Sequence, residues 1–182
     1  MAYKFISTEI PGLLVVESEK FGDKRGFFME IFKESAFLQG GLQARFKQDN
    51  CSFSRKNVLR GMHYQLPPFA QGKFVRVLKG AIWDVGVDIR KFSPTFGKWQ
   101  AMELNEKNNL ALYLPPGFAH GFVVLSEEAL VIYKITEEYH PESERGIRWN
   151  DPTINIAWPV KNPIVAERDR ILPLLKDAGV FE

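Results

Sequence analysis

The sequence of 182 residues contains little cysteine and no long apolar run. Cys51 is the only cysteine, so an intrachain disulfide is impossible and a cysteine-based zinc site would be incomplete. This cysteine usage fits a reducing cytoplasm. Apolar runs are only a few residues long, and the N-terminal segment carries Glu9 and Pro11 where a signal peptide needs an apolar region. We therefore expect a cytoplasmic protein that neither spans a membrane nor is exported.

An excess of charge of one sign is also missing. The 24 Lys and Arg residues are balanced by 22 Asp and Glu residues, for a net charge of +2, and no basic block could follow a phosphate backbone. We therefore expect no nucleic acid partner. Apolar residues make up 45% of the chain and charged residues 25%, as in ordinary globular proteins. The length predicts a single domain over residues 1–182.

Strand-forming segments dominate the middle of the chain. They are short, rich in Val, Ile, Phe, Tyr and Trp, and separated by Gly, Pro, Asn or Ser. These segments cover residues 73–80, 81–89, 98–105, 110–115, 120–126 and 129–136. Short strands at such intervals are typical of an antiparallel sandwich or barrel. The sequence therefore predicts an all-β protein.

Helical patterns are scarce and predict only short peripheral helices. Residues 33–41 end on a glycine pair suited to a helix C-terminus, and residues 166–179 are interrupted by Pro173. Residues 141–163 contain four prolines and have no sustained period, which predicts an irregular wrap over the barrel; this C-terminal wrap is expected to extend over about residues 141–182.

Two of the predicted strands carry polar side chains on an apolar face. Strict alternation in residues 129–136 places Tyr133 with Ala129 and Val131, so we expect its ring to point inward. The same count places Lys73 beside Val75, which is an unusual neighbourhood for an ammonium group. Such a lysine either reaches the rim of the barrel or has a chemical role.

A metal site is the first hypothesis for the histidines. The segments GMHYQ and LPPGFAHG, which contain His63 and His120, resemble the two motifs of the cupin superfamily. Metal-binding cupins use a His-x-His pair, but the second position of the pair is Gln65 here, and an amide oxygen is a poor ligand for a transition metal. We therefore expect no bound metal. A metal-dependent cupin oxygenase, or a cupin that binds a small ligand without catalysis, remains an alternative.

Proton transfer is the hypothesis that fits the polar residues without a metal. A neutral histidine such as His63 can take a proton from a carbon beside a carbonyl at physiological pH. Lys73 could stabilise the enolate oxygen, and Tyr133 could return a proton from the other face, which would invert the carbon. Each residue has a structural alternative: a histidine can be a hydrogen-bonding residue and a tyrosine can be core packing. A buried lysine is harder to explain as structure.

A second group of residues suggests a phosphate-bearing, nucleotide-linked substrate. The segments GDKRGFFME and KQDN carry charged, aromatic and amide side chains, and Arg60 lies close to His63. Guanidinium groups bind phosphate oxygens with two parallel hydrogen bonds, and Tyr139 could stack on a base. Any one of the arginines could instead lie on the solvent-exposed surface without binding a ligand. An odd offset would put Arg60 and His63 on opposite faces of an ideal strand, but a bulge at Gly61 would bring them together.

The longer motifs resemble those of one family. GDKRGFFME, QDN, VLRGMHYQLPPFAQGKFVRV, VGVDIRKFSPTFGKW, LPPGFAHGF, VIYKIT, YHPESERGIRWNDP and INIAWP together are similar to the dTDP-4-dehydrorhamnose 3,5-epimerase family, from about residue 5 to about residue 170. The resemblance implies a cupin-like jelly-roll barrel that is usually a homodimer and needs no metal or cofactor. It also implies a dTDP-4-keto-6-deoxy sugar as substrate, on the route to dTDP-L-rhamnose. Relatives that invert a single carbon share much of the pattern.

The resemblance implies roles for particular residues. His63 would be the base, Tyr133 the proton donor, Lys73 the group that stabilises the enolate, and Asp169 the carboxylate that orients the histidine. Tyr139 would stack on thymine. The implied substrate contacts are Arg25, Phe27, Glu30, Gln48, Asp49, Asn50, Arg60, Lys73, His120, Tyr139, Glu144 and Arg168.

Some of these assignments carry qualifications of their own. Arg25 and Glu30 would act across the dimer interface. Arg168 stands where the family has a lysine, and an arginine fork cannot replace an ammonium group in detail. Asp84 is a weaker candidate partner for Lys73.

Overall fold

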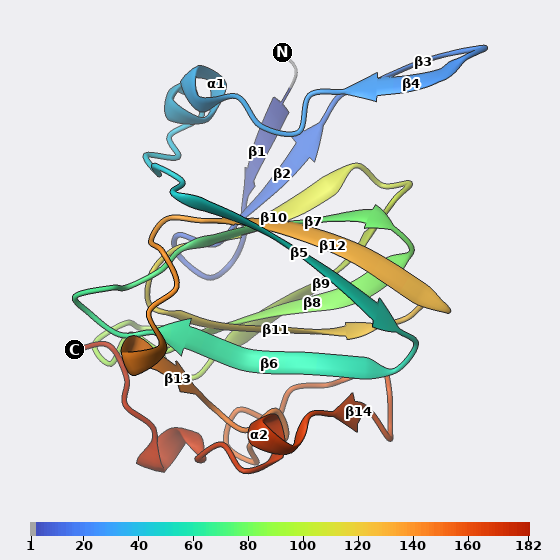
Figure 1. The fold of residues 1–182 in the computed structure, drawn as a ribbon. Helices are drawn as coiled ribbons and strands as arrows, with labels where there is room; N and C mark the ends of the chain where they lie inside the picture. Colours follow the sequence, from blue (N-terminus) through green and yellow to red (C-terminus); the bar gives the residue numbers. More distant parts are fainter. Residues whose placement is uncertain (1–2) are drawn as a thin grey trace.

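The computed structural model describes residues 3–182 and contains two antiparallel sheets that face each other (Figure 1). In spatial order, the first sheet contains β1 (Tyr3–Ser7), β2 (Leu14–Ser18), β10 (Leu110–Leu114), β7 (Lys73–Lys79), β12 (Glu128–Ile135) and β5 (Gln48–Arg55). The second sheet contains β13 (Glu144–Gly146), β6 (Val58–Gln65), β11 (Phe118–Val124), β8 (Ala81–Asp88) and β9 (Trp99–Asn105). A short strand, β14 (Ile164–Val165), pairs with β6 in parallel.

The remaining elements are short. Strands β3 (Lys20–Asp23) and β4 (Gly26–Met29) form a separate two-stranded hairpin. The helices are α1 (Glu34–Gln39) and α2 (Glu167–Arg170), with 3-10 turns η1 (Pro141–Ser143) and η2 (Leu175–Asp177). Across residues 3–182, no helix is both long and apolar enough to cross a membrane. The expected all-β fold with short peripheral helices is confirmed.

The predicted strands between residues 73 and 136 correspond to β7 through β12. The predicted helix at 33–41 is α1, and Pro173 separates α2 from η2 as the sequence indicated. The strands β1 to β5 were not predicted, because their polar and apolar residues follow no clear strand pattern. The C-terminal segment from residue 141 has little regular structure, but β13 and β14 add short pairings to β6 that no local pattern predicted.

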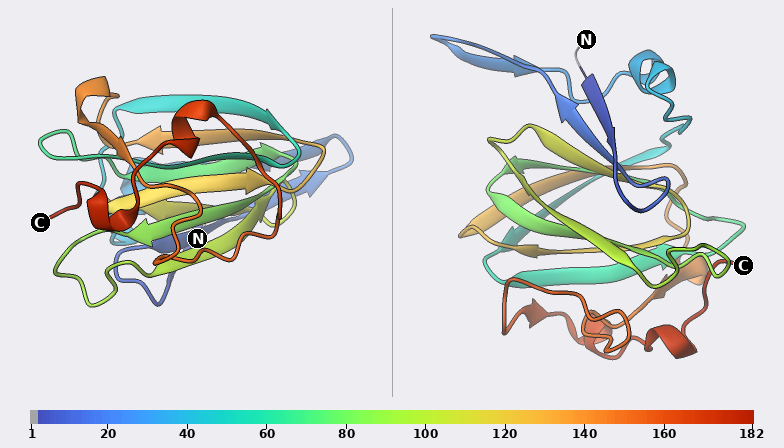
Figure 2. Two further views of the ribbon diagram at one scale, coloured as in Figure 1. Left: turned by 90° about the horizontal axis from the view of Figure 1, so that it is seen from below. Right: turned by 180° about the vertical axis from the view of Figure 1, so that it is seen from behind.

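Apolar side chains fill the space between the sheets, and both outer faces are covered as well. The central core includes Val75 and Val77 of β7, Leu112 of β10 and Val131 of β12, all nearly or completely buried. The N-terminal segment with α1 lies on the outer side of the first sheet, and the C-terminal segment lies on the outer side of the second (Figures 1 and 2). Strands β7, β8, β10 and β11 are largely buried and rich in apolar residues, which explains why they were recognisable, whereas β9 and β12 are only partly buried.

Strand β6 contains the predicted bulge. His63 pairs with His120 of β11, whereas Arg60 pairs with Phe122. Between these two pairs β6 therefore has one residue more than β11, which is a bulge. Gly61 has a φ of +145°, and a Cβ atom added there would lie 2.6 Å from the Cα of Gly121. Only glycine fits this position. The bulge brings Arg60 and His63 to the wall of the same cavity, as the sequence analysis expected.

Candidate active site

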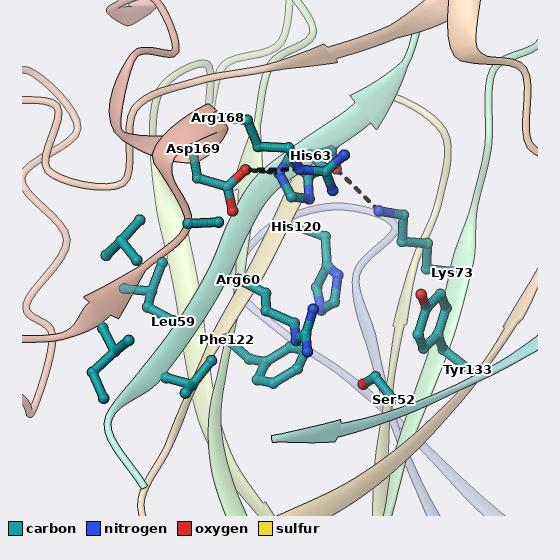
Figure 3. A pocket seen from close by; sticks show the side chains of 14 residues that line it. Ser52, Leu59, Arg60, His63, Lys73, His120, Phe122, Tyr133, Arg168 and Asp169 are labelled. Carbon is teal, nitrogen blue, oxygen red and sulfur yellow. Dashed lines mark hydrogen bonds and ion pairs between the residues drawn. The ribbon is translucent and has the colours of Figure 1, made fainter. Parts of the chain in front are cut away.

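A cavity of about 380 Å³ lies among side chains from both sheets and the C-terminal segment (Figure 3). Strands β6 and β11 of the second sheet and β5, β7 and β12 of the first contribute to its wall. Its lining residues are Ser52, Val58, Leu59, Arg60, His63, Lys73, His120, Phe122, Tyr133, Ile164, Val165, Ala166, Arg168 and Asp169. The four residues expected to catalyse proton transfer are therefore all in this wall.

His63 and Asp169 form a hydrogen-bonded pair at one side of the cavity. His63 Nε2 lies 2.8 Å from Asp169 Oδ1, and the aspartate side chain is almost completely buried. Burial raises the pKa of Asp169, but the hydrogen bond from His63 and that from the Gly61 N–H outweigh it, so the net pKa is below the usual value. An ionised carboxylate only accepts hydrogen bonds, so a neutral His63 donates from Nε2. Its lone pair is then on Nδ1, the atom that could take a proton.

Lys73 is buried next to the histidine. Only 9% of the residue is exposed, and its Nζ donates to the carbonyl oxygen of His63 at 3.1 Å. Burial lowers the pKa of Lys73 to about 8, although Glu144 and Asp84 act in the opposite direction. The inward orientation predicted from the alternation of β7 is confirmed. The ammonium group is thus held close to the proposed base, with its charge only partly compensated.

Tyr133 enters the cavity from the opposite sheet. It lies on β12, and Figure 3 shows its ring beside Lys73 and across the cavity from His63 and Asp169. The ring packs against the central core, as the alternation of β12 predicted. Burial raises the pKa of the Tyr133 hydroxyl, so it stays protonated at neutral pH and can serve as a proton donor.

A second histidine–aspartate pair lies deeper in the wall and was not predicted. His120 Nε2 lies 2.7 Å from Asp84 Oδ1, and the other oxygen of the buried aspartate has no hydrogen-bond partner within residues 3–182. The sequence predicts Asp84 as a weaker candidate partner of Lys73. Its direct partner is His120, and its charge acts on Lys73 only over a longer distance by raising the pKa of the lysine.

Several residues expected to bind the nucleotide gather in one hydrogen-bonded group. The hydroxyl of Tyr139 donates to Glu144 Oε2 at 2.9 Å, and the N–H of Tyr139 donates to Gln48 Oε1 at 3.0 Å. Gln48 also donates to Asn50 Oδ1 at 2.8 Å, and Arg168 Nη1 lies 3.9 Å from Glu144. About half of Tyr139 is exposed, so part of its surface is accessible to a ligand.

This group borders a second hollow of about 280 Å³ that shares His63, Arg168 and Asp169 with the cavity and extends to Glu144. A ligand with a sugar in the cavity and a nucleotide near Tyr139 would therefore pass by Arg168.

Arg60 lines the cavity with a guanidinium group that makes no ion pair within the described part of the chain. Its Nε donates to Ser54 Oγ at 2.9 Å and its Nη2 donates to the carbonyl oxygen of Phe53 at 3.3 Å. These bonds fix the direction of the side chain and leave other N–H groups free. An anion such as a diphosphate could accept from them.

Eight of the twelve expected contact residues do not line this cavity. Gln48, Asn50, Tyr139 and Glu144 form the hydrogen-bonded group described above, and the other four, Arg25, Phe27, Glu30 and Asp49, belong neither to that group nor to the cavity wall. Arg25 lies in the turn of the β3–β4 hairpin and pairs with Asp23 at 2.6 Å. Asp49 is on the outer face of β5, where it pairs with Lys134 at 2.6 Å, because alternate residues of a strand point to opposite faces. Their roles stay predictions.

Ser52 is a cavity residue that sequence reasoning missed. Its hydroxyl is buried and has no hydrogen-bond partner within residues 3–182. It lies two residues after Asn50 on β5 and so shares a face of the strand with Gln48 and Asn50. The alternation of side chains along the strand could therefore have predicted it. Within the same part of the chain, no group of three or more His, Cys, Asp or Glu residues is arranged to hold a metal ion.

A jelly-roll barrel with a histidine–aspartate pair, a buried lysine and a tyrosine around one cavity defines a cupin-like enzyme built for proton transfer. Comparison with known proteins identifies it further. The chain belongs to the dTDP-4-dehydrorhamnose 3,5-epimerase family, whose model matches residues 7–177. It is therefore an isomerase, and the cupin-like fold expected from the sequence is confirmed.

Relatives and solved structures agree with this assignment. The dTDP-4-dehydrorhamnose 3,5-epimerase of Shigella flexneri is 54% identical over 97% of this chain and 98% of its own length. The crystal structure of the enzyme from Sulfolobus tokodaii has a TM-score of 0.93 and 46% identity, with complete coverage of both chains. The Legionella pneumophila dTDP-6-deoxy-D-glucose-3,5-epimerase, solved in complex with dTDP-4-keto-L-rhamnose, has a TM-score of 0.92 and 45% identity over 96% of this chain and 93% of its own.

Proposed function

We propose that the enzyme inverts C3 and C5 of dTDP-4-dehydro-6-deoxyglucose and so produces dTDP-4-dehydro-β-L-rhamnose, on the route to dTDP-L-rhamnose. The observation that carries the proposal is that His63 and Tyr133 line one cavity from opposite sheets, with Lys73 between them. The ligand in the Legionella pneumophila structure, dTDP-4-keto-L-rhamnose, supports the same substrate class.

The proposed chemistry follows from the ketone at C4. The carbonyl makes the hydrogens on C3 and C5 acidic, because the carbanion left at either carbon is stabilised as an enolate. His63 takes the proton from one face while Asp169 stabilises the imidazolium that forms. The ammonium group of Lys73 stabilises the enolate oxygen. Tyr133 then gives a proton to the opposite face, and transfer of the histidine proton back to the tyrosinate completes an isomerisation without net loss of a proton.

Binding of the nucleotide is proposed for the outer group of residues. Tyr139 stacks on thymine, with Gln48, Asn50 and Glu144 beside it, and the diphosphate lies between Arg60 and Arg168. The guanidinium of Arg60 supports this role, because it makes no ion pair within residues 3–182 and keeps N–H groups free to donate to phosphate oxygens. The sugar then extends past His63 toward His120 and Ser52.

NMR of the purified protein with dTDP-4-dehydro-6-deoxyglucose tests this proposal. The expected product has inverted configuration at both C3 and C5. Inversion at one carbon alone would make the enzyme a 3- or a 5-epimerase. No conversion of the 4-keto sugar would contradict the proposal.

The pH dependence of kcat tests the role of Lys73. Because the pKa of Lys73 is lowered to about 8, the ammonium group loses its charge as pH rises through that value, and kcat should fall. Tyr133 does not explain such a fall, since its pKa is raised rather than lowered. The measurement is kcat from about pH 6 to about pH 10 for the wild type and for Lys73→Met, which should be slow and lack this decline. A wild-type kcat that stays flat across about pH 8 would remove the lysine charge from the mechanism.

We also propose that the active enzyme is a homodimer in which the β3–β4 hairpin of each chain reaches the site of the other. The hairpin projects away from the barrel in Figure 1 and exposes Phe21, Phe27 and Phe28. An isolated hairpin is only marginally stable in water, and exposed aromatic side chains favour contact with a partner. Such an arrangement would bring Arg25, Phe27 and Glu30 to a cavity that they do not reach within their own chain.

Mixed dimers test this arrangement. Arg25→Ala and His63→Ala chains should each be inactive alone. Co-expressed, they should recover about a quarter of the wild-type activity, because half of the dimers are mixed and each mixed dimer contains one site with both residues intact. If Arg25 acts within its own chain, every site lacks one residue and no activity returns. Each single variant measured separately provides the baseline.

The same proposal places the enzyme in the cytoplasm, with a small-molecule substrate and no nucleic acid or membrane partner. The single exposed cysteine and the balanced charge support this location and choice of partner. We further propose that residues 1–182 act as one domain, since the C-terminal segment supplies Asp169 to the cavity formed by the sheets.

A further inference from the structure

Gln65 is the last residue of β6 and lies two positions after His63, so the two side chains leave the same face of the strand. Only 3% of Gln65 is exposed. In the cupin-like motif this is the position where metal-binding relatives carry a second histidine. Here the amide is fully engaged by the protein itself, and the way it is engaged connects two parts of the site.

The amide of Gln65 holds the backbone on both sides of Tyr139. Its Nε2 donates to the carbonyl oxygen of Glu138 at 3.1 Å, and its Oε1 accepts from the N–H of His140 at 2.8 Å. Nε2 also donates to the carbonyl oxygen of Phe69 at 2.8 Å. The side chain therefore fixes the peptide groups immediately before and after the tyrosine that we propose to stack on thymine.

Glu144, the hydrogen-bond partner of Tyr139, is tied to the same residue through the backbone. In the pairing of β13 with β6, Glu144 is opposite Gln65, while Gly146 is opposite His63. Both members of the Tyr139–Glu144 pair thus have their position set relative to Gln65. Because Gln65 and His63 belong to one short stretch of β6, the distance from the base to the stacking tyrosine is fixed by this stretch.

We infer that Gln65 is a positioning residue that sets the location of the nucleotide-binding residues Tyr139 and Glu144 relative to the base His63. The inference rests on the proposed function, because it assigns Gln65 a role in binding the dTDP part of the substrate. Gln65 itself does not line the sugar cavity, so it acts through Tyr139 and not on the reacting carbons. Its loss would move the nucleotide and leave the acid and base unchanged.

The test is a comparison of KM and kcat for Gln65→Met, which keeps the length of the side chain and removes all three hydrogen bonds. We expect KM for the dTDP-linked sugar to rise about tenfold and kcat to change less than about threefold. The Kd for dTDP alone, measured by titration calorimetry, should rise by the same factor as KM. Should this variant fail to fold, Gln65→Glu keeps the acceptor for the His140 N–H and loses only the donated bonds.

Thr95→Ala is the matched control. Its hydroxyl donates a partly buried hydrogen bond to Asp88 at 2.6 Å, in a loop that lines neither hollow of the site. This variant loses a comparable bond, so its Tm should fall while KM and the Kd for dTDP stay at the wild-type values. A general loss of stability would therefore be separated from a loss of positioning.

The outcomes distinguish the two proposals. If the wild type binds dTDP and epimerises the sugar but Gln65→Met has unchanged KM and Kd, the positioning role is wrong and the function stands. A fall in kcat with unchanged KM would also overturn the inference. If the wild type neither binds dTDP nor converts the sugar, the proposed function itself fails.

Discussion

Replacement of His63 with alanine should lower kcat by about a thousandfold or more and abolish exchange of the C3 and C5 hydrogens with solvent. The imidazole of His63 lines the cavity and is hydrogen-bonded to the buried carboxylate of Asp169, on the side of the cavity opposite Tyr133. Removing it leaves Asp169 close to the cavity, but an ionised aspartate of lowered pKa is a weak base. Exchange at both carbons should be lost together, because one base serves both.

Added imidazole provides a control for His63→Ala. A small base that enters the vacated space should restore part of the exchange, whereas a variant that is misfolded should not respond. Unchanged thermal unfolding would support the same conclusion. Full exchange in the alanine variant without imidazole would remove His63 from the mechanism.

Replacement of Tyr133 with phenylalanine should slow inversion by about a hundredfold or more while exchange is affected less. The phenyl ring keeps the packing against the central core and removes only the hydroxyl. His63 and Lys73 can still form the enolate, which then takes the proton back on its original face. The measurement is the ratio of solvent exchange to net inversion, followed by NMR.

Tyr113→Phe is the matched control for this prediction. Tyr113 is also a buried tyrosine with a raised pKa, but it packs with Phe37 and Phe74 on the outer side of the first sheet. Its loss should change neither exchange nor inversion. An equal fall of exchange and inversion in Tyr133→Phe would mean that the tyrosine acts before the enolate forms.

The strands of the barrel could be predicted where one face meets the central core. Residues 73–79 and 128–135 are rich in β-branched and aromatic residues, and alternate residues of each segment pack in that core. Strand β5 could not be predicted in this way. Its sequence, QDNCSFSR, is polar on the face that meets the site, so the pattern required for binding hides the pattern of a strand.

The residues of the candidate site also fall into two groups, those that a local sequence pattern predicts and those that it does not. Alternation placed Lys73 and Tyr133 in the cavity, and the glycine in β6 indicated the bulge that brings Arg60 to His63. Asp169 is 106 residues away from His63, and no local pattern connects them, so its role came from the family resemblance alone. The hydrogen bonds from Gln65 to the backbone around Tyr139 depend on contacts between segments that are distant in the sequence. The same is true of the His120–Asp84 pair.

The central claim is that one imidazole removes the protons from two carbons that flank the same ketone. Position-resolved NMR of dTDP-4-dehydro-6-deoxyglucose in heavy water tests it most directly, with wild-type enzyme and His63→Ala side by side. We predict deuterium at both C3 and C5 with the wild type and at neither carbon with the variant. Exchange that persists at one carbon in the variant would require a second base and would contradict the account.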